Sequence, residues 1–520
     1  MEKLLRDLRW IVPASLGLGL VLSLLGPGTW WIGWLTYMLV IGLGLSALSA
    51  LWRSAGSSQV IGLMLLLTMI LRLGLGMAFS YILPAYGNDT PVQHAGYIFP
   101  DAYNRDTQAW ELASSHDSLL KAFDRTYSID QYGGLLFVSS LLYRFASPDA
   151  HRPWLIILLA ALVGAIGVIL VYRAARKAWG ESVGLGIGWI MVLYPEAVLQ
   201  GSSQMREPFL MTFVAMSFWG VVNWTENRRI SLVWMAGGVI GLLLFNSGVA
   251  AAAIIILAIW FWLSRKERPI KWWVWAGALG LAVLAGLMFF LALRGGTPGK
   301  GGLLAGFLDW FRFSANYDAS VLELNSGWLQ TMLSFLPQPL HMPFIAAYGI
   351  AQPVLPAAIA DPAVWPMRIL GILRGLGWYA LLPFLVFSLR PIWKVTDKRE
   401  RLAWLWLWVA SWAWIILSST RAGGDQWDNP RYRVILLLFQ AALAVYSLLW
   451  ARQNRDHWLG RILAVEGVFL ALFGYWYVSR YVIEGLRVYN ILIILTAIVV
   501  ISMVIIIGGW LWDRRQAKRV

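Results

Sequence analysis

The chain has 520 residues, of which 59% are hydrophobic and only 13% are charged, and it contains 33 Trp. A composition this apolar excludes an ordinary water-soluble fold and predicts a polytopic membrane protein. The absence of cysteine excludes disulfides, thiolate nucleophiles and Cys-ligated metals, and the formal net charge of +15 is the Lys and Arg excess typical of cytoplasmic loops that face anionic lipid.

Apolar segments long enough to cross a bilayer follow one another along the chain. A span needs roughly 17 to 25 apolar residues, and this criterion predicts about 14 transmembrane helices, within a range of roughly 12 to 14. The predicted spans are 10–26, 29–52, 59–83, 153–172, 181–199, 208–223, 231–247, 249–264, 272–293, 367–389, 402–418, 433–451, 461–479 and 488–511. The predicted fold class is an all-α polytopic membrane protein.

Basic residues distinguish the two sides of the membrane. If the N-terminus is cytoplasmic, every second connection is cytoplasmic, and these connections with both chain ends contain 25 of the 42 Lys and Arg but 9 of the 27 Asp and Glu. Cytoplasmic segments show this asymmetry. We therefore predict a plasma or inner membrane protein with both termini in the cytoplasm and with membrane lipids as partners. The topology accounts for the positive charge, so no nucleic acid is expected as a partner.

Two large loops face the exterior in this topology, at 84–152 and 294–366. The first contains an apolar stretch at 135–145 that is too short to span, which predicts an interfacial or half-inserted helix. The second is interrupted by prolines and is predicted to form a lid of short helices. We expect its His341 to be packed rather than to bind a metal, because no second His or carboxylate lies at ligand spacing.

The first loop gathers acids in the stretch FPDAYNRDTQAWELASSHD. These acids are Asp101, Asp106, Glu111 and Asp117. A helix beginning at Pro100 would place Asp101 near its N-cap, so Asp101 is either a helix cap or a catalytic base at the membrane surface, beside Tyr103. Asp101 and Asp106 would lie about 140° apart on a regular helix, which does not form a two-carboxylate metal site. A loop could instead bring Asp101 and Asp130 together, and the metal requirement stays open.

A second exterior cluster is LYPEAVLQGSSQMREPFL, residues 193–210, between the fifth and sixth spans. It contains Glu196, Arg206 and Glu207. Glu207 begins the next helix, where an acid ordinarily complements the helix dipole. The alternative is that Glu207, with Asp106 as a second candidate, organises an acceptor or a cation, so a divalent cation is a possible cofactor.

A third cluster is STRAGGDQWDNPRYR, between the eleventh and twelfth spans, which contains Arg421, Arg431 and Arg433. This arginine density is the reverse of what an exterior loop needs, which indicates an anionic partner. Phosphate suits the guanidinium fork. The alternative is that the arginines pair with Asp425 and Asp428 or reach to lipid headgroups.

The order of these features resembles the GT-C superfamily of integral membrane glycosyltransferases, in particular the branch of the protein O-mannosyltransferases and aminoarabinose transferases. The similar segments are PDAYNRDTQAWELA, LLYRF with LVYRAARKAWGE, LYPEAVLQGSSQMREPFL and NPRYRVILLLFQAAL, which cover roughly 97–225 and 420–445. The family usually has one span before its acidic loop, whereas three are predicted here. We therefore expect residues 1–58 to be two added helices and 59–520 to be the GT-C-like domain. Ala102 follows Asp101 where the family often has a second acid.

The resemblance implies transfer of a sugar from a polyprenyl-phosphate donor to a lipid, glycan or protein acceptor at the outer membrane face. Asp101 would be the general base of an inverting reaction. Arg431, Arg433 and Arg206 would stabilise the leaving phosphate, Arg421 and Tyr103 would help to bind the lipid phosphate, and the second-line acids are Asp106, Glu207, Glu196 and Asp130.

Three alternatives stay open at this point. A glycan polymerase or ligase acting on lipid-linked oligosaccharide shares the donor chemistry. A lipid or solute transporter should show paired ionisable groups or broken helices near the bilayer midplane, where Arg72 is the main charge and Arg374 and Glu466 are others. A purely structural membrane protein would leave the exterior acids and arginines unexplained.

Overall fold

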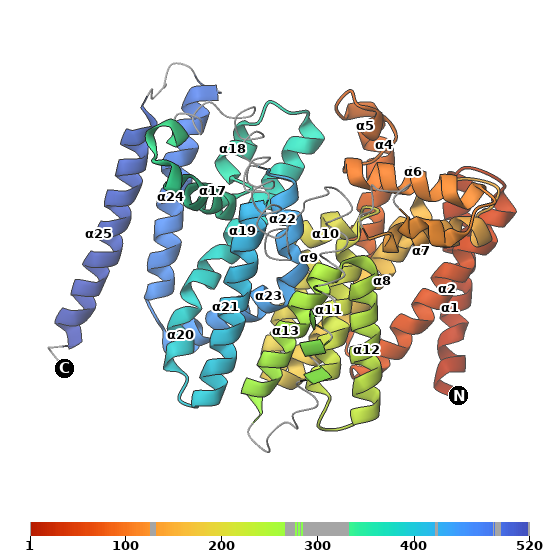
Figure 1. The fold of residues 1–520 in the computed structure, drawn as a ribbon, viewed down its shortest axis with the longest axis horizontal. Helices are drawn as coiled ribbons and strands as arrows, with labels where there is room; N and C mark the ends of the chain where they lie inside the picture. The colour runs from red at the N-terminus through yellow and green to blue at the C-terminus, as the bar shows by residue number, and fades with distance from the viewer. Residues whose placement is uncertain are drawn as a thin grey trace, which may run out of the picture. The chain divides into compact units, whose positions relative to one another are not determined.

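The computed structural model describes residues 2–124, 132–265, 332–421, 425–481 and 490–517, with isolated residues between 276 and 286 and residue 483. Every regular element in these ranges is a helix (Figure 1). The chain divides into two compact units. The first contains Met1–Phe307 and Val434–Leu438, and the second contains Leu308–Arg433 and Phe439–Val520.

The helices of the first unit are α1 (Glu2–Leu25), α2 (Trp30–Ser54), α3 (Gln59–Met69), the π-helical turn η1 (Ile70–Gly74), α4 (Leu75–Tyr86), α5 (Pro91–His94), α6 (Pro100–Ser114), the 3-10 turn η2 (Leu119–Phe123), α7 (Gly134–Ala146), α8 (Trp154–Trp179), α9 (Glu181–Leu193), α10 (Pro195–Gly201), α11 (Glu207–Val222), α12 (Arg228–Phe245) and α13 (Ser247–Ser264). The remaining helices are α17 (Gln338–Ala351), α18 (Leu355–Ala360), α19 (Trp365–Phe387), α20 (Leu389–Lys394), α21 (Lys398–Arg421), α22 (Asp428–Arg433), the 3-10 turn η4 (Val434–Leu436), α23 (Leu437–Asn454), α24 (Trp458–Tyr481) and α25 (Ile491–Ala517).

The predicted class, an all-α polytopic membrane protein, is confirmed. Within the described ranges, eleven helices are long and apolar enough to cross a membrane, or twelve if the bent pair α9 and α10 counts as one. The eleven coincide with predicted spans. The predicted span 208–223 is α11, an apolar helix of 16 residues. The predicted span 272–293 lies largely outside the described residues.

The fifth predicted span is broken rather than straight. Helices α9 and α10 meet at an angle of 56°. Pro195 lacks the backbone N–H that would continue α9, and it forces the preceding Tyr194 into an extended conformation. The chain therefore bends at Tyr194 into the short helix α10, which is followed by the non-helical residues 202–206, where the sequence suggested a continuous helix and a short turn.

Connections in the first unit alternate between two ends, as the predicted topology requires. At one end, Lys177 forms a 2.7 Å ion pair with Glu226, and Arg173 donates to Ser54 at 2.8 Å. At the other end, the turn before α2 contacts the loop before α8. Helices α6 and α7 lie across the direction of the long helices at this second end (Figure 1), as predicted for the interfacial stretch 135–145. The side of the membrane that each end faces stays a prediction.

The first two helices pack as an integral part of the first unit. Tyr37, Ile41 and Leu48 of α2 share a buried cluster with residues of α3 and α8, among them Ile61 and Leu162. Burial of these aliphatic side chains is the main free-energy gain that holds α2 to α8. The idea that 1–58 was added to a complete 59–520 domain stays a prediction.

The described part of the second exterior loop forms short helices, as predicted. Helices α17 and α18 cover residues 338–360, and Val354, before α18, joins a buried cluster with Phe473 and Trp476 of α24. His341 lies in α17 with its Nε2 atom 2.9 Å from the carbonyl oxygen of Leu336. This is the packed environment expected for it.

Candidate functional site

Helix α6 begins at Pro100, as the sequence indicated. Its N-cap residue is Phe99, which has no side-chain acceptor, and Asp101 is half-buried in the first turn. Asp101 is therefore not the cap itself, although its carboxylate lies where it complements the helix dipole. Tyr103 is also half-buried, with its ring edge-on to that of Tyr97 at 5.4 Å between centroids. The role of Asp101 as general base stays a prediction.

Asp106, named only as a second-line acid, is the best-connected acid of α6. It is buried, and its carboxylate accepts hydrogen bonds from the Tyr143 hydroxyl at 2.6 Å and the Tyr97 hydroxyl at 2.7 Å. The Nε2 atom of His151 lies 3.0 Å from the same carboxylate. Burial, and then the nearby carboxylate, raises the pKa of both tyrosines well above the usual value. Both hydroxyls therefore stay protonated and continue to donate to Asp106.

An aromatic layer encloses the Asp106 cluster, which we define as Tyr97, Asp106, Tyr143 and His151. The Trp110 ring stacks on the imidazole of His151 with 5.5 Å between centroids, and Tyr143 meets that imidazole edge-on at 5.0 Å. The side chain of His151 is 27% exposed. The cluster is thus closed on the protein side and accessible at the imidazole.

Sequence reasoning missed Tyr97, Tyr143 and His151, because they lie 9, 37 and 45 positions from Asp106. One indication was available. The buried residues of α6 recur at helical spacing and include Ala102, Asp106 and Ala109. An acid on the apolar face of an amphipathic helix predicts a buried carboxylate with hydrogen-bond donors around it.

Two arginines hold α6 in place. Arg144 of α7 donates to the carbonyl oxygens of Leu112, Ala113, Ser115 and Asp117, and so satisfies the C-terminal end of α6. Arg105, which is buried, donates through Nη1 to the carbonyl oxygen of Gln204 at 3.2 Å. Helix α6 therefore contacts the irregular segment after α10 directly.

The predicted second cluster extends from α10 through residues 202–206 to the start of α11. Glu196 is buried and accepts a 2.7 Å hydrogen bond from Nε2 of Gln200. The Arg206 guanidinium lies 5.1 Å from the centroid of the Tyr132 ring, and its Nε atom is 4.0 Å from Oε1 of Glu207. Glu207 is fully buried in the first turn of α11, so it combines the predicted dipole-complementing position with a desolvated carboxylate. Asp130 lies outside the described residues.

Arg72 lies in η1, at the middle of the continuous span Gln59–Tyr86. It is buried, and it donates to the carbonyl oxygens of Met191 at 3.0 Å and Ala197 at 3.5 Å. These carbonyls flank the break between α9 and α10, where the backbone lacks helical partners. Arg72 thus donates hydrogen bonds to backbone carbonyls of the broken span. Gly201 makes room for Arg72, because a Cβ at position 201 would lie 2.3 Å from Cδ of Arg72.

The predicted arginines of the second unit are held by backbone carbonyls and aromatic rings. Arg433 is buried, with its guanidinium 3.4 Å from the centroid of a Trp378 ring and a 2.9 Å hydrogen bond to the carbonyl oxygen of Gln352. Arg374, which the sequence noted only as a deep charge, donates to the carbonyl oxygen of Trp427 at 2.8 Å and lies over its ring at 4.6 Å.

The other two arginines, Arg431 and Arg421, have an anionic and an aromatic neighbour respectively. Arg431 forms a 3.2 Å ion pair with Asp428, which is the alternative that the sequence left open. Arg421 lies over the Tyr432 ring at 4.9 Å. Asp425 accepts from the backbone N–H of Asp428 at 3.0 Å, at the start of α22.

No metal site can be assigned. In the part of the chain that the structure describes, no three His, Asp or Glu side chains come close enough to hold a metal ion.

No protein-family model matches the chain, and no curated protein sequence matches it. Several solved structures are similar to it, among them the following two. One is the archaeal oligosaccharyltransferase AglB from Archaeoglobus fulgidus in complex with an inhibitory peptide and a dolichol-phosphate, at 13% identity and a TM-score of 0.38, covering 89% of this chain and 56% of that one. The other is the Archaeoglobus fulgidus oligosaccharyltransferase tethered to an acceptor peptide that contains the NVT sequon, at 13% identity and a TM-score of 0.37, covering 88% and 54%. The chain thus spans little more than half the length of these proteins.

Proposed function

We propose that the protein is a GT-C-like membrane glycosyltransferase that moves a sugar from a polyprenyl-phosphate carrier to an acceptor, at the end of the first unit that carries α6, α7 and α10. The contact between Arg105 and Gln204 is the observation that carries this proposal. It joins two segments, 97–114 and 193–210, whose resemblance to that superfamily was noted from sequence alone. If the resemblance of these two segments to the superfamily were accidental, there would be no reason for the segments to contact each other in the folded chain.

The physical requirements of such a substrate match this end of the unit. A polyprenyl tail dissolves only in lipid, whereas its phosphate and sugar stay at the interface. Helices that lie across the spans provide polar groups at that level. The buried Asp106, Arg105 and Glu207 are polar side chains of this kind.

The proposed reaction is an inverting displacement at the anomeric carbon. The acceptor hydroxyl attacks that carbon, its proton passes to Asp101 as general base, and the bond from the anomeric carbon to the phosphate oxygen breaks. The leaving polyprenyl phosphate becomes a monoester and gains negative charge, which Arg206 stabilises. The same role for Arg431 and Arg433 stays a prediction, as do binding of the lipid phosphate by Arg421 and Tyr103 and an exterior location of the site. A lipid, glycan or protein acceptor fits equally, so a glycan polymerase or ligase is a variant of this proposal.

A transporter is the second candidate, and one observation favours it. Arg72 is buried in the middle of a span and contacts the break between α9 and α10. Broken spans with exposed carbonyls beside a buried charge are typical of secondary transporters.

Purified protein in proteoliposomes with a radiolabelled polyprenyl-phosphate sugar separates the two functions. We expect the wild type to transfer labelled sugar to the acceptor. Asp101→Asn should lower the rate of transfer by roughly 10²–10⁴-fold, which is the usual contribution of a general base. Glu111→Gln, an exposed acid on the same helix, is the matched control and should transfer normally. Movement of labelled lipid across the bilayer without any transfer would favour the transporter instead.

A further inference from the structure

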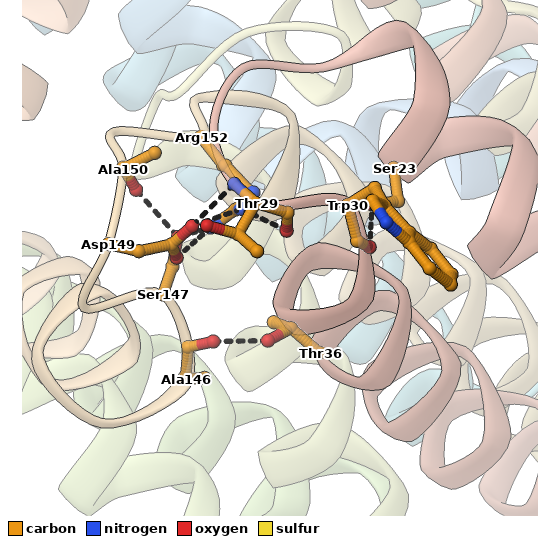
Figure 2. A network of polar contacts seen from close by, with 9 residues as sticks. All are labelled: Ser23, Thr29, Trp30, Thr36, Ala146, Ser147, Asp149, Ala150 and Arg152. Atoms are coloured by element: carbon orange, nitrogen blue, oxygen red, sulfur yellow. Dashed lines mark hydrogen bonds and ion pairs between the residues drawn. The ribbon is translucent and has the colours of Figure 1, made fainter.

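The turn between α1 and α2 is tied to the loop between α7 and α8 by an ionic network around the buried Arg152 (Figure 2). Arg152 donates through both terminal nitrogens to Asp149, at 2.6 and 2.8 Å, and through Nη2 to the carbonyl oxygen of Thr29 at 3.0 Å. The backbone N–H of Thr29 donates to Asp149 at 2.7 Å. We call Thr29, Ser147, Asp149 and Arg152 the Arg152 network.

This network is more than an exposed ion pair. The side chain of Arg152 has no exposed surface and that of Asp149 is 17% exposed. The hydrogen bonds from Arg152 hold the pKa of the Asp149 carboxyl well below its usual range. Arg152 also donates to the hydroxyl of Ser147 at 2.7 Å, and that hydroxyl donates to the carbonyl oxygen of Ala150 at 2.6 Å. The loop is thereby fixed internally as well as to the turn.

The turn is shaped to accept the loop. Gly28 has a φ of +85°, a conformation that favours glycine, and a Cβ there would lie 2.4 Å from Cβ of Ala150 and 2.7 Å from Nη2 of Arg152. Thr36, one turn into α2, donates to the carbonyl oxygen of Ala146 at the end of α7. The close approach therefore depends on the absence of a side chain at Gly28.

The same loop carries His151, between two members of the network. His151 reaches α6 through its 3.0 Å contact with Asp106 and its stacking on Trp110. A continuous series of contacts therefore runs from the turn before α2, through Asp149 and Arg152, to His151 and the middle of α6. A small displacement of the loop would move the imidazole and the helix that it contacts.

We propose that the first two helices have a role in the site: the turn between them fixes the loop 146–152, and His151 on that loop is a positioning residue that sets the place of α6 through Asp106. The expected effect of this positioning on the rate of sugar transfer rests on the proposed function. The positioning of α6 itself does not.

A thiol reporter tests the positioning directly, because the chain has no cysteine and a single introduced one is unambiguous. Thr107→Cys places it at a half-buried position of α6, next to Asp106, and Ser217→Cys places a second reporter at a buried position of α11. We expect Gly28→Ala, Arg152→Ala and His151→Ala to raise the maleimide reaction rate at position 107 by at least about threefold, as expected when a local contact is released. The rate at position 217 should stay unchanged.

Two control variants make the same types of substitution away from the network, one at a glycine with positive φ and one at an arginine in a bidentate ion pair. Gly180 has a φ of +93° but nothing within 4 Å of an added Cβ, so Gly180→Ala imposes the backbone strain without the steric contact. Arg461 forms an equivalent bidentate pair with Asp513, at 2.6 and 2.7 Å, in the second unit. Neither Gly180→Ala nor Arg461→Ala should change labelling at position 107. Unchanged labelling at position 107 in all three test variants would overturn the proposal. An equal rise in labelling at positions 107 and 217 would also overturn it, because the network would then contribute to the overall stability of the unit and not to the position of α6.

Sugar transfer supplies an independent readout. At matched thermal stability, Gly28→Ala and His151→Ala should lower kcat by about 10-fold or more with the donor KM unchanged, because a misplacement of about 1 Å costs up to 10²-fold. His151→Gln, which keeps a donor toward Asp106, should recover part of the loss. If the wild type transfers no sugar, the proposed function fails, and the thiol measurement still decides whether the first two helices position α6.

Discussion

A buried carboxylate of the first unit and two buried guanidinium groups of the second unit are satisfied in different ways. In the first unit, the carboxylate of Asp106 is satisfied by hydroxyl and imidazole groups from three separate segments. In the second unit, the guanidinium groups of Arg374 and Arg433 are satisfied by backbone carbonyls and indole rings, which do not titrate. The stability of the Asp106 cluster depends on the protonation of its donors, so it is sensitive to pH and to the loss of a single donor atom. The arrangement around the two arginines depends on the placement of rings.

Removal of the carboxylate should produce the largest effect. Asp106→Ala leaves two buried hydroxyls and an imidazole without their acceptor, and we expect a loss of about 3–5 kcal/mol in the free energy of unfolding. Thermal unfolding of detergent-purified protein measures it, with the smaller loss expected for Asp106→Asn as the comparison. A stability within about 1 kcal/mol of the wild type would show that the cluster does not hold α6.

Removal of a cation from the second unit should cost less. Arg433→Met keeps the aliphatic stem over Trp378 but loses the charge–ring contact and the hydrogen bond to Gln352, for an expected loss of about 2–3 kcal/mol. Arg433→Lys keeps the charge without the planar group and should recover only part of it. Equal stability of the Lys variant and the wild type would mean that charge, and not the stacking geometry, matters there.

Removal of one hydrogen-bond donor to Asp106 should lower the free energy of unfolding by a smaller amount, and this amount should depend on pH. Tyr143→Phe loses one hydrogen bond to a carboxylate, for about 1.5–3 kcal/mol at neutral pH. Because the folded state raises the pKa of Tyr143, its contribution is complete below the unfolded value near 10 and is lost as the pH rises above it. A plot of stability against pH between roughly 8 and 11 should therefore fall less steeply for Tyr143→Phe than for the wild type. Parallel curves would count against titration of this hydroxyl.

The smallest effect concerns Asp149 in acid. Its pKa is lowered in the folded state, so its contribution is complete above the unfolded value near 3.9 and is lost as the pH falls below it. At a pH equal to that unfolded value the loss is only about 0.4 kcal/mol. The difference between wild type and Asp149→Asn should stay constant from about pH 7 to 5 and shrink below about pH 4. A difference that already shrinks at pH 6 would assign the titration to another group.

The spans were predictable because each is a local property of the sequence. Runs such as 154–171 and 491–512 contain no charged residue, and Pro100 alone marked the start of α6. The partners of the charged residues were not predictable in this way. Nothing near Arg433 indicates that Trp378 and Gln352 would meet it, and His151 gives no sign that it faces Asp106. Asp101 attracted attention because it stands at a helix start, whereas the desolvated acid lies five residues further along.

The contacts of Arg72 also constrain the order in which the chain enters the membrane. The carbonyl oxygens that receive its hydrogen bonds lie 119 and 125 positions further along the chain. At synthesis rates of about 5–20 residues per second, the third span emerges roughly 6 to 25 seconds before its partners. Until then its guanidinium carries an insertion cost of about 2.5–3.5 kcal/mol without compensation. The insertion of this span is therefore less favourable by that cost until α9 and α10 arrive, and a chain truncated before them should keep an uncompensated charge in its third span.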